Sequence, residues 1–164
     1  MELLRVSPSL TEEKDEIIST AYSLARNFIM YELDGSSVKA NTQVEKTLRR
    51  VVTEIFERYR TILNAVSKRL RYSEVNEKYK EHSPIERMFL MIADEIFRDS
   101  QENWGQIVSL YVLGGILARN NEAAHNGRDI DAIIQTLGNY IATKKRKWIE
   151  QNGGWRHFVM WYHL

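Results

Sequence analysis

The chain of 164 residues has no cysteine and only two prolines. The lack of cysteine excludes disulfide bonds, thiolate metal sites and a cysteine nucleophile, and it fits a reducing compartment. The apolar stretch over residues 103–120 is shorter than the about 20 apolar residues that a membrane-spanning helix needs. The N-terminal stretch MELLRVSPSL lacks a basic region followed by a long apolar segment, so it is not a secretory signal.

An excess of one charge is missing as well. Lys and Arg number 23 against 22 Asp and Glu, which gives a formal net charge of +1. No net field therefore draws the whole molecule to nucleic acid or to an acidic membrane, and we expect no nucleic-acid partner. The contents of 43% hydrophobic and 27% charged residues are ordinary for a globular protein. The length predicts a single domain over residues 1–164.

Motifs for catalysis and metal binding are absent from the sequence. There is no phosphate-binding loop, no GxSxG motif and no dinucleotide fingerprint, and the carboxylates fit solvated helix faces. The histidines do not form the i,i+4 pair with an adjacent acid that a zincin-type site uses; they are His82, His125, His157 and His163. We therefore expect a protein that is not an enzyme and that needs neither a metal nor a cofactor.

The basic run Lys144–Lys147 is the strongest local concentration of charge. It fits a site for nucleic acid or anionic lipid, or the C-terminus of a helix, where cations interact favourably with the helix dipole. Because the net charge is balanced, we favour the helix terminus.

Apolar residues recur at helical spacing along most of the chain. The patterns predict a helix over 10–33, opened by a capping box of Ser9 and Glu12, and a second helix from about Val44 to Leu70. Segment 71–82 is polar and weakly patterned, which indicates a loop or a short helix. No stretch alternates as a strand does, so the fold class is all-α.

A third helix begins in SPIERMFLMIADEIFRD, where Ser83 is the predicted N-cap and Pro84 occupies the first helical position. A fourth is expected in NWGQIVSLYVLGGILARN, capped by Asn103. This helix contains three glycines, each of which costs roughly 1 kcal/mol against alanine in a helix interior. We therefore expect another helix to pack directly against it.

Three segments resemble the homology motifs of one known family. EIFRDSQENWGQIVSLYVLGGILA and WIEQNGGWRHFVMWY resemble the first and second motifs of the B-cell lymphoma 2 family of apoptosis regulators, and TLRRVVTEIFERYRTIL resembles the third. The resemblance implies a bundle of about eight helices around a central hydrophobic hairpin, here 103–119 and 128–143.

Survival-promoting members of that family bind one amphipathic death-segment helix in an apolar groove, which is a helix-in-groove mode of recognition. The resemblance gives Asn103 a place at the groove floor and lets the ligand helix approach over Gly105, while Gly114 and Gly115 serve packing inside the bundle. Without the resemblance, the apolar groove residues are ordinary core. The implied groove residues are Ile55, Tyr59, Leu63, Val66, Ile92, Ile96, Asn103, Gly105, Gln106, Leu113 and Tyr162.

The sequence departs from the family pattern at two places. Family members typically carry arginine after NWG, which pairs with an aspartate of the ligand, whereas this chain has Gln106. Arg98 and Arg119 are the candidates to replace that arginine. The death segments of killer ligands carry Gly-Asp where this chain has Val52 and Thr53, so it resembles a receptor of such segments more than a donor.

These features predict an anti-apoptotic protein whose partners are pro-apoptotic family members and their death-segment helices. Two alternatives stay open: a membrane-permeabilising effector of the same fold, and a non-apoptotic scaffold that binds a similar helix. We expect a cytoplasmic location, with the mitochondrial outer membrane as a second one. Membrane contact is expected only if an anchor follows Leu164.

Overall fold

The computed structural model describes residues 10–71, 77–98, 102–122 and 127–163. The described residues contain helices and no strand, which confirms the predicted all-α class. Short helical turns lie at Gly35–Ser37 and Glu77–Tyr79, and a π-helical turn lies at Ile141–Lys145. The α-helices are α1 (Leu10–Asp34), α2 (Gln43–Arg71), α3 (Pro84–Phe97), α4 (Trp104–Glu122), α5 (Gly127–Tyr140), α6 (Arg146–Gln151) and α7 (Gly154–Trp161).

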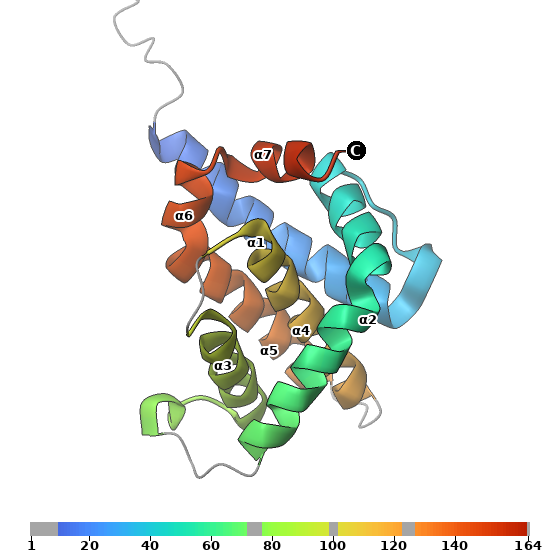
Figure 1. The fold of residues 1–164 in the computed structure, drawn as a ribbon, viewed down its shortest axis with the longest axis vertical. Helices are drawn as coiled ribbons and strands as arrows, with labels where there is room; N and C mark the ends of the chain where they lie inside the picture. Colours follow the sequence, from blue (N-terminus) through green and yellow to red (C-terminus); the bar gives the residue numbers. More distant parts are fainter. Residues whose placement is uncertain (1–9, 72–76, 99–101, 123–126, 164) are drawn as a thin grey trace, which may run out of the picture.

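Helix α4 is the centre of the bundle. It contacts α1, α2, α3 and α5, and the short helices α6 and α7 lie together at one end of the molecule (Figure 1). Tyr111 is fully buried, and its hydroxyl donates a hydrogen bond of 3.2 Å to the backbone oxygen of Ala21 in α1. Apolar side chains on every side of α4 are buried: Ile107, Val108, Leu110, Val112, Leu113, Leu117 and Ala118. Together α4 and α5 form the predicted central hairpin, in nearly the predicted ranges.

The adjacent glycines in α4 allow this close packing. A Cβ atom added at Gly114 would lie 2.9 Å from Cδ2 of Leu137 in α5, and one added at Gly115 would lie 3.2 Å from Cε2 of Phe28 in α1. The first distance is shorter than real contacts of a Cβ atom, and the second is tighter than most of them. The prediction that Gly114 and Gly115 serve packing inside the bundle agrees with these distances.

The helix starts follow local capping signals. The predicted cap of α3 is confirmed, because Ser83 Oγ accepts a hydrogen bond from the backbone N–H of Glu86 and Pro84 is the first helical residue. At α2, Thr42 and Glu45 form a capping box that the sequence analysis did not identify: Thr42 Oγ1 accepts from the Glu45 N–H at 3.1 Å, and Glu45 Oε1 accepts from the Thr42 N–H at 3.1 Å. The predicted box of Ser9 and Glu12 lies outside what the structure describes.

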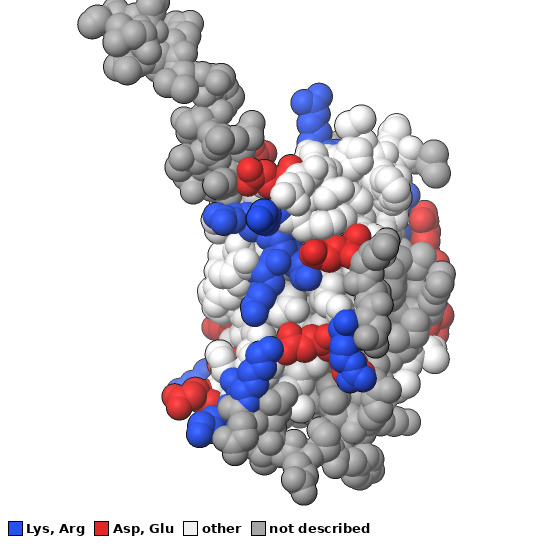
Figure 2. Space-filling view, turned by 60° about the vertical axis from the view of Figure 1, so that its left-hand side comes forward, with Lys and Arg blue, Asp and Glu red and all other residues white. Residues whose placement is uncertain are grey.

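The prediction that Lys144–Lys147 ends a helix is wrong. The π-helical turn Ile141–Lys145 continues α5 directly into α6, and it directs Lys145 inward while Lys144 stays exposed. The ammonium group of Lys145 is neutralised by Glu102 at 3.2 Å, which allows its burial. Figure 2 shows basic and acidic side chains interspersed on the face that it presents, rather than a continuous basic surface.

Two further observations concern membranes and metals. Within the described residues, every helix is too short or too polar to cross a membrane. The same residues contain no group of three or more His, Cys, Asp or Glu side chains placed to hold a metal ion.

Candidate functional site

The first turn of α4 is the best-defined part of the candidate groove. Asn103 Oδ1 accepts a hydrogen bond of 2.9 Å from the backbone N–H of Gln106, which confirms the predicted cap. The Gln106 carbonyl accepts a bond of 2.6 Å from Ser109 Oγ. Asn103 is exposed, Gly105 and Gln106 are partly exposed, and Trp104 between them is buried. This turn therefore presents a small, polar surface above a large buried indole ring.

An aromatic cluster supports the turn from below. The ring centroid of Trp104 lies 4.9 Å from that of Trp148, 5.9 Å from that of Trp155 and 5.4 Å from that of Phe158. The indole N–H of Trp155 donates to the backbone oxygen of Ile17 at 3.1 Å. The two sequence motifs at residues 95–118 and 148–162 thus meet around one ring, and their packing fixes the start of α4.

The end of α7 is tied to α2 and to the same cluster. The Tyr162 ring packs edge-on against Phe158, with 5.3 Å between the ring centroids. Its backbone oxygen accepts a hydrogen bond from the guanidinium group of Arg50 in α2. Tyr162 is partly buried, so the predicted groove residue near the C-terminus is held beside the first half of α2.

The predicted groove residues fall into three groups by their burial. Ile96, Asn103, Gly105, Gln106 and Tyr162 are at least partly exposed. Leu63, Ile92 and Leu113 are core residues with 1%, 0% and 0% of their surface exposed. The side chains of Ile55, Tyr59 and Val66 lie outside the described part of the structure. The groove assignment therefore stays a prediction.

The two candidates to replace the family arginine differ in position. Arg98 follows α3 directly, and its guanidinium group lies 3.1 Å from a carboxylate oxygen of Glu95. Arg119 lies near the opposite end of α4, roughly 20 Å from Gln106 along the helix axis at 1.5 Å per residue. It makes an ion pair of 2.7 Å with Glu32 of α1. Arg119 is therefore too far away to serve a ligand at Gln106.

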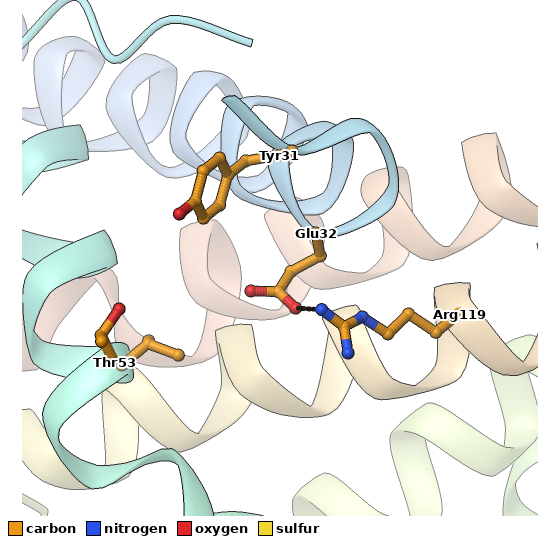
Figure 3. A pocket seen from close by; sticks show the side chains of 6 residues that line it. Tyr31, Glu32, Thr53 and Arg119 are labelled. Carbon is orange, nitrogen blue, oxygen red and sulfur yellow. Dashed lines mark ion pairs between the residues drawn. The ribbon is translucent and has the colours of Figure 1, made fainter. Parts of the chain in front are cut away.

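A concavity surrounds this ion pair (Figure 3). It has a volume of about 340 Å³ and is lined by Tyr31, Glu32, Gly35, Val52, Thr53 and Arg119. Burial raises the pKa of the Glu32 carboxyl, while the charge of Arg119 acts in the opposite direction. No local sequence pattern predicts this pocket, because its walls come from α1, α2 and α4.

Together, the described residues form a bundle of helices around a buried hairpin, and the capped start of α4 packs on an aromatic cluster. A family model described as "Apoptosis regulator proteins, Bcl-2 family" matches residues 48–155. The chain belongs to the Bcl-2 family of apoptosis regulators.

Curated relatives cover most of this chain. Apoptosis regulator Bcl-2 of the dog, Canis lupus familiaris, is 29% identical over 119 residues, which is 73% of this chain and 47% of the relative. Bcl-2-like protein 1 of Rattus norvegicus is 28% identical over 130 residues, which is 79% of this chain and 52% of the relative. The chain thus spans about half the length of the curated relatives that it matches.

Solved structures share the fold at lower identity. The zebrafish pro-survival protein NRZ in complex with the Bad BH3 segment superimposes with a TM-score of 0.71 at 20% identity, covering 93% of this chain and 99% of that chain. Chicken BOK superimposes with a TM-score of 0.71 at 24% identity, covering 94% and 98%. These likenesses confirm the Bcl-2 fold.

Proposed function

We propose that the protein is a pro-survival family member that binds the amphipathic BH3 helix of a pro-apoptotic partner. The groove runs along α2 and α3, over the first turn of α4, to the end of α7. The observation that carries this proposal is the first turn of α4, which is capped by Asn103, anchored by buried Trp104 and partly exposed at Gly105. A glycine at this position lets the backbone of a visiting helix approach closely.

The sequence of α2 supports a receptor rather than a donor of a BH3 helix. Val52 is only 3% exposed and belongs to the hydrophobic core, where the resemblance expects glycine in a killer ligand. Thr53 is exposed, carries no charge, and donates its hydroxyl to the backbone oxygen of Arg49 at 2.8 Å. To act as a ligand, α2 would have to leave the core, and its valine would then hinder close approach to another helix.

Because Gln106 is neutral where family members typically carry arginine, we expect polar contacts at this position to add little to the binding free energy. A hydrogen bond between neutral groups contributes about 0.5–1.5 kcal/mol, whereas one to a charged group contributes about 1.5–3 kcal/mol. Burial of each apolar anchor of the ligand contributes roughly 1.5–3 kcal/mol. The apolar anchors of the ligand therefore provide most of the binding free energy. We place this binding in the cytoplasm and at the mitochondrial outer membrane.

Calorimetry against a panel of BH3 peptides of about 25 residues tests the proposal. We expect at least one peptide to bind one-to-one with a Kd below 1 μM, which corresponds to about −8 kcal/mol or better. Heat signals absent across a broad panel would contradict the proposed groove, and would leave a scaffold for another helix as the better hypothesis.

A second assay separates an inhibitor from an effector. Liposomes of mitochondrial lipid composition are loaded with dye and treated with a permeabilising family member. We expect this chain to reduce the dye release, because it sequesters the BH3 helix of that member. Dye release caused by this chain alone would contradict a pro-survival role and favour the effector.

A further inference from the structure

Lys145 is a buried cation beside the start of α4. It lies at the end of the π-helical turn and is 7% exposed, whereas its neighbour Lys144 is exposed. A π-helical turn is rare and often marks a functional site, because the extra residue in the turn changes which side chains face inward. Here the turn directs the side chain of Lys145 toward the segment that joins α3 to α4.

Lys145 makes two contacts, one at each end of that segment. Its Nζ atom lies 3.5 Å from the ring centroid of Phe97, the last residue of α3. The same atom lies 3.2 Å from Oε2 of Glu102, the residue immediately before the Asn103 cap. One ammonium group therefore connects the end of α3 with the start of α4.

Both contacts are adjacent to predicted groove residues. Phe97 follows Ile96, and Glu102 precedes Asn103, whose side chain caps α4 at Gln106. The Phe97 ring also stacks on Tyr140, the last residue of α5, with 6.3 Å between the centroids. Lys145 thus contacts the two residues that flank Ile96 and Asn103 in the sequence.

The Lys145–Glu102 pair is better explained as a contact that positions its neighbours than as a contribution to the free energy of folding. The side chain of Glu102 is 40% exposed, so water screens the pair and its contribution to folding is small. A cation held between a ring face and a carboxylate does fix the relative position of these two groups. An apolar side chain in its place would fill the volume but would not hold Glu102.

We infer that Lys145 is a positioning residue for the BH3 groove, acting through Phe97 and Glu102 on Ile96, Asn103 and Gln106. This inference rests on the proposed function, since it concerns the affinity of that same groove. Its ligand is the amphipathic helix of a pro-apoptotic partner, and Lys145 does not touch it.

The test compares Lys145→Met with Lys144→Met in the full chain. Methionine keeps an unbranched side chain of similar shape and removes the ammonium group with its charge and its hydrogen-bond donors, and Lys144 is the adjacent exposed lysine. We expect Lys145→Met to weaken binding of the tightest BH3 peptide by about tenfold or more, mainly through faster dissociation, and Lys144→Met to leave it unchanged. Lys145→Arg, which keeps a cation able to stack and pair, should recover most of the affinity.

Two further readouts separate positioning from folding. Melting temperatures of the two methionine variants should agree within a few degrees, while hydrogen exchange at the Gln106 amide should be faster in Lys145→Met alone, because its cap is less well held. If Lys145→Met does not fold, Glu102→Gln replaces it, since Glu102 is 40% exposed and should show the same loss of affinity.

The possible failures are distinguishable. A wild-type chain that binds no peptide of the panel would overturn the proposed function and this inference together. A wild-type chain that binds, with a Lys145→Met variant of equal affinity and equal Gln106 amide exchange, would overturn the inference alone.

Discussion

The first turn and the middle of α4 both contain glycine among apolar side chains, but the two glycines have different surroundings. At the first turn, Gly105 is partly exposed beside buried Trp104. Nine residues further on, Gly114 is buried against Leu137 of α5. The two glycines thus differ in their surroundings: Gly114 packs against a neighbouring helix of the same bundle, whereas Gly105 lies in the partly exposed first turn, where we propose that a ligand helix approaches.

The largest effect is expected from Gly105→Glu in the first turn of α4. A glutamate there blocks the approach of the ligand backbone and places a charge beside apolar surface, so we expect peptide binding to be lost while the fold is retained. Calorimetry measures the first expectation and circular dichroism the second. Gln135→Glu, on the exposed side of α5, is the control and should bind normally. An unchanged affinity in a folded Gly105→Glu variant would mean that the groove lies elsewhere.

Gly114→Val, in the middle of α4, should instead lower the stability of the fold. Its Cβ atom alone would lie 2.9 Å from Leu137 Cδ2, and the added methyl groups worsen the clash. Overpacking of this kind costs about 1–3 kcal/mol of unfolding free energy, which urea denaturation measures. At Gly127 nothing lies within 4 Å of an added Cβ, so Gly127→Val should change stability much less. Equal losses in the two variants would contradict the close contact between α4 and α5.

The sequence alone predicts those features of the fold whose signals lie within a few neighbouring residues. Ser83 and Asn103 cap their helices as predicted, because a cap depends on residues within one turn of the chain. The resemblance to the family motifs predicted the central hairpin. Gly114 and Gly115 are then explained as positions where a neighbouring helix packs closely.

Contacts between distant segments could not be predicted. Nothing in the run Lys144–Lys147 distinguishes the buried Lys145 from its neighbours, because its burial depends on Glu102 and Phe97. The pocket around Glu32 and Arg119 likewise joins α1 to the far end of α4. Three of the predicted groove residues, Leu63, Ile92 and Leu113, are buried in the core, and their burial likewise depends on contacts between distant segments.

The third prediction concerns the contact between Gln106, in the first turn of α4, and an aspartate of the ligand. If the ligand aspartate meets only the neutral amide of Gln106, replacing that aspartate with alanine should cost less than about 1.5 kcal/mol. Gln106→Arg should strengthen binding of the aspartate-bearing peptide and have little effect on the alanine peptide. A double-mutant cycle over Gln106 and the ligand aspartate measures this coupling by calorimetry. A loss of several kcal/mol in the wild type would instead assign the role to Arg98.

The smallest effect is expected from the ion pair between Glu32 of α1 and Arg119 near the C-terminal end of α4. Burial raises the pKa of Glu32 above its ordinary 4.5, so the folded state binds the proton more tightly than the unfolded state does. The unfolding free energy contributed by this group must therefore fall as the pH rises from 4.5 toward the raised value. Arg119 offsets part of this loss, but its side chain is 52% exposed and water screens the pair.

Glu32→Gln removes the titrating group, so the variant should lack this part of the pH dependence. We expect the stability difference between wild type and variant to change by about 1 kcal/mol or less between pH 5 and pH 7, in favour of the variant at pH 7. Urea denaturation at both pH values measures it, with the exposed Glu57→Gln as a control that should follow the wild type. Peptide affinity should not change, because the pair lies at the end of α4 away from Gln106. A stability difference that grows in favour of the wild type at pH 7 would show that the charge of Arg119 outweighs the burial of Glu32.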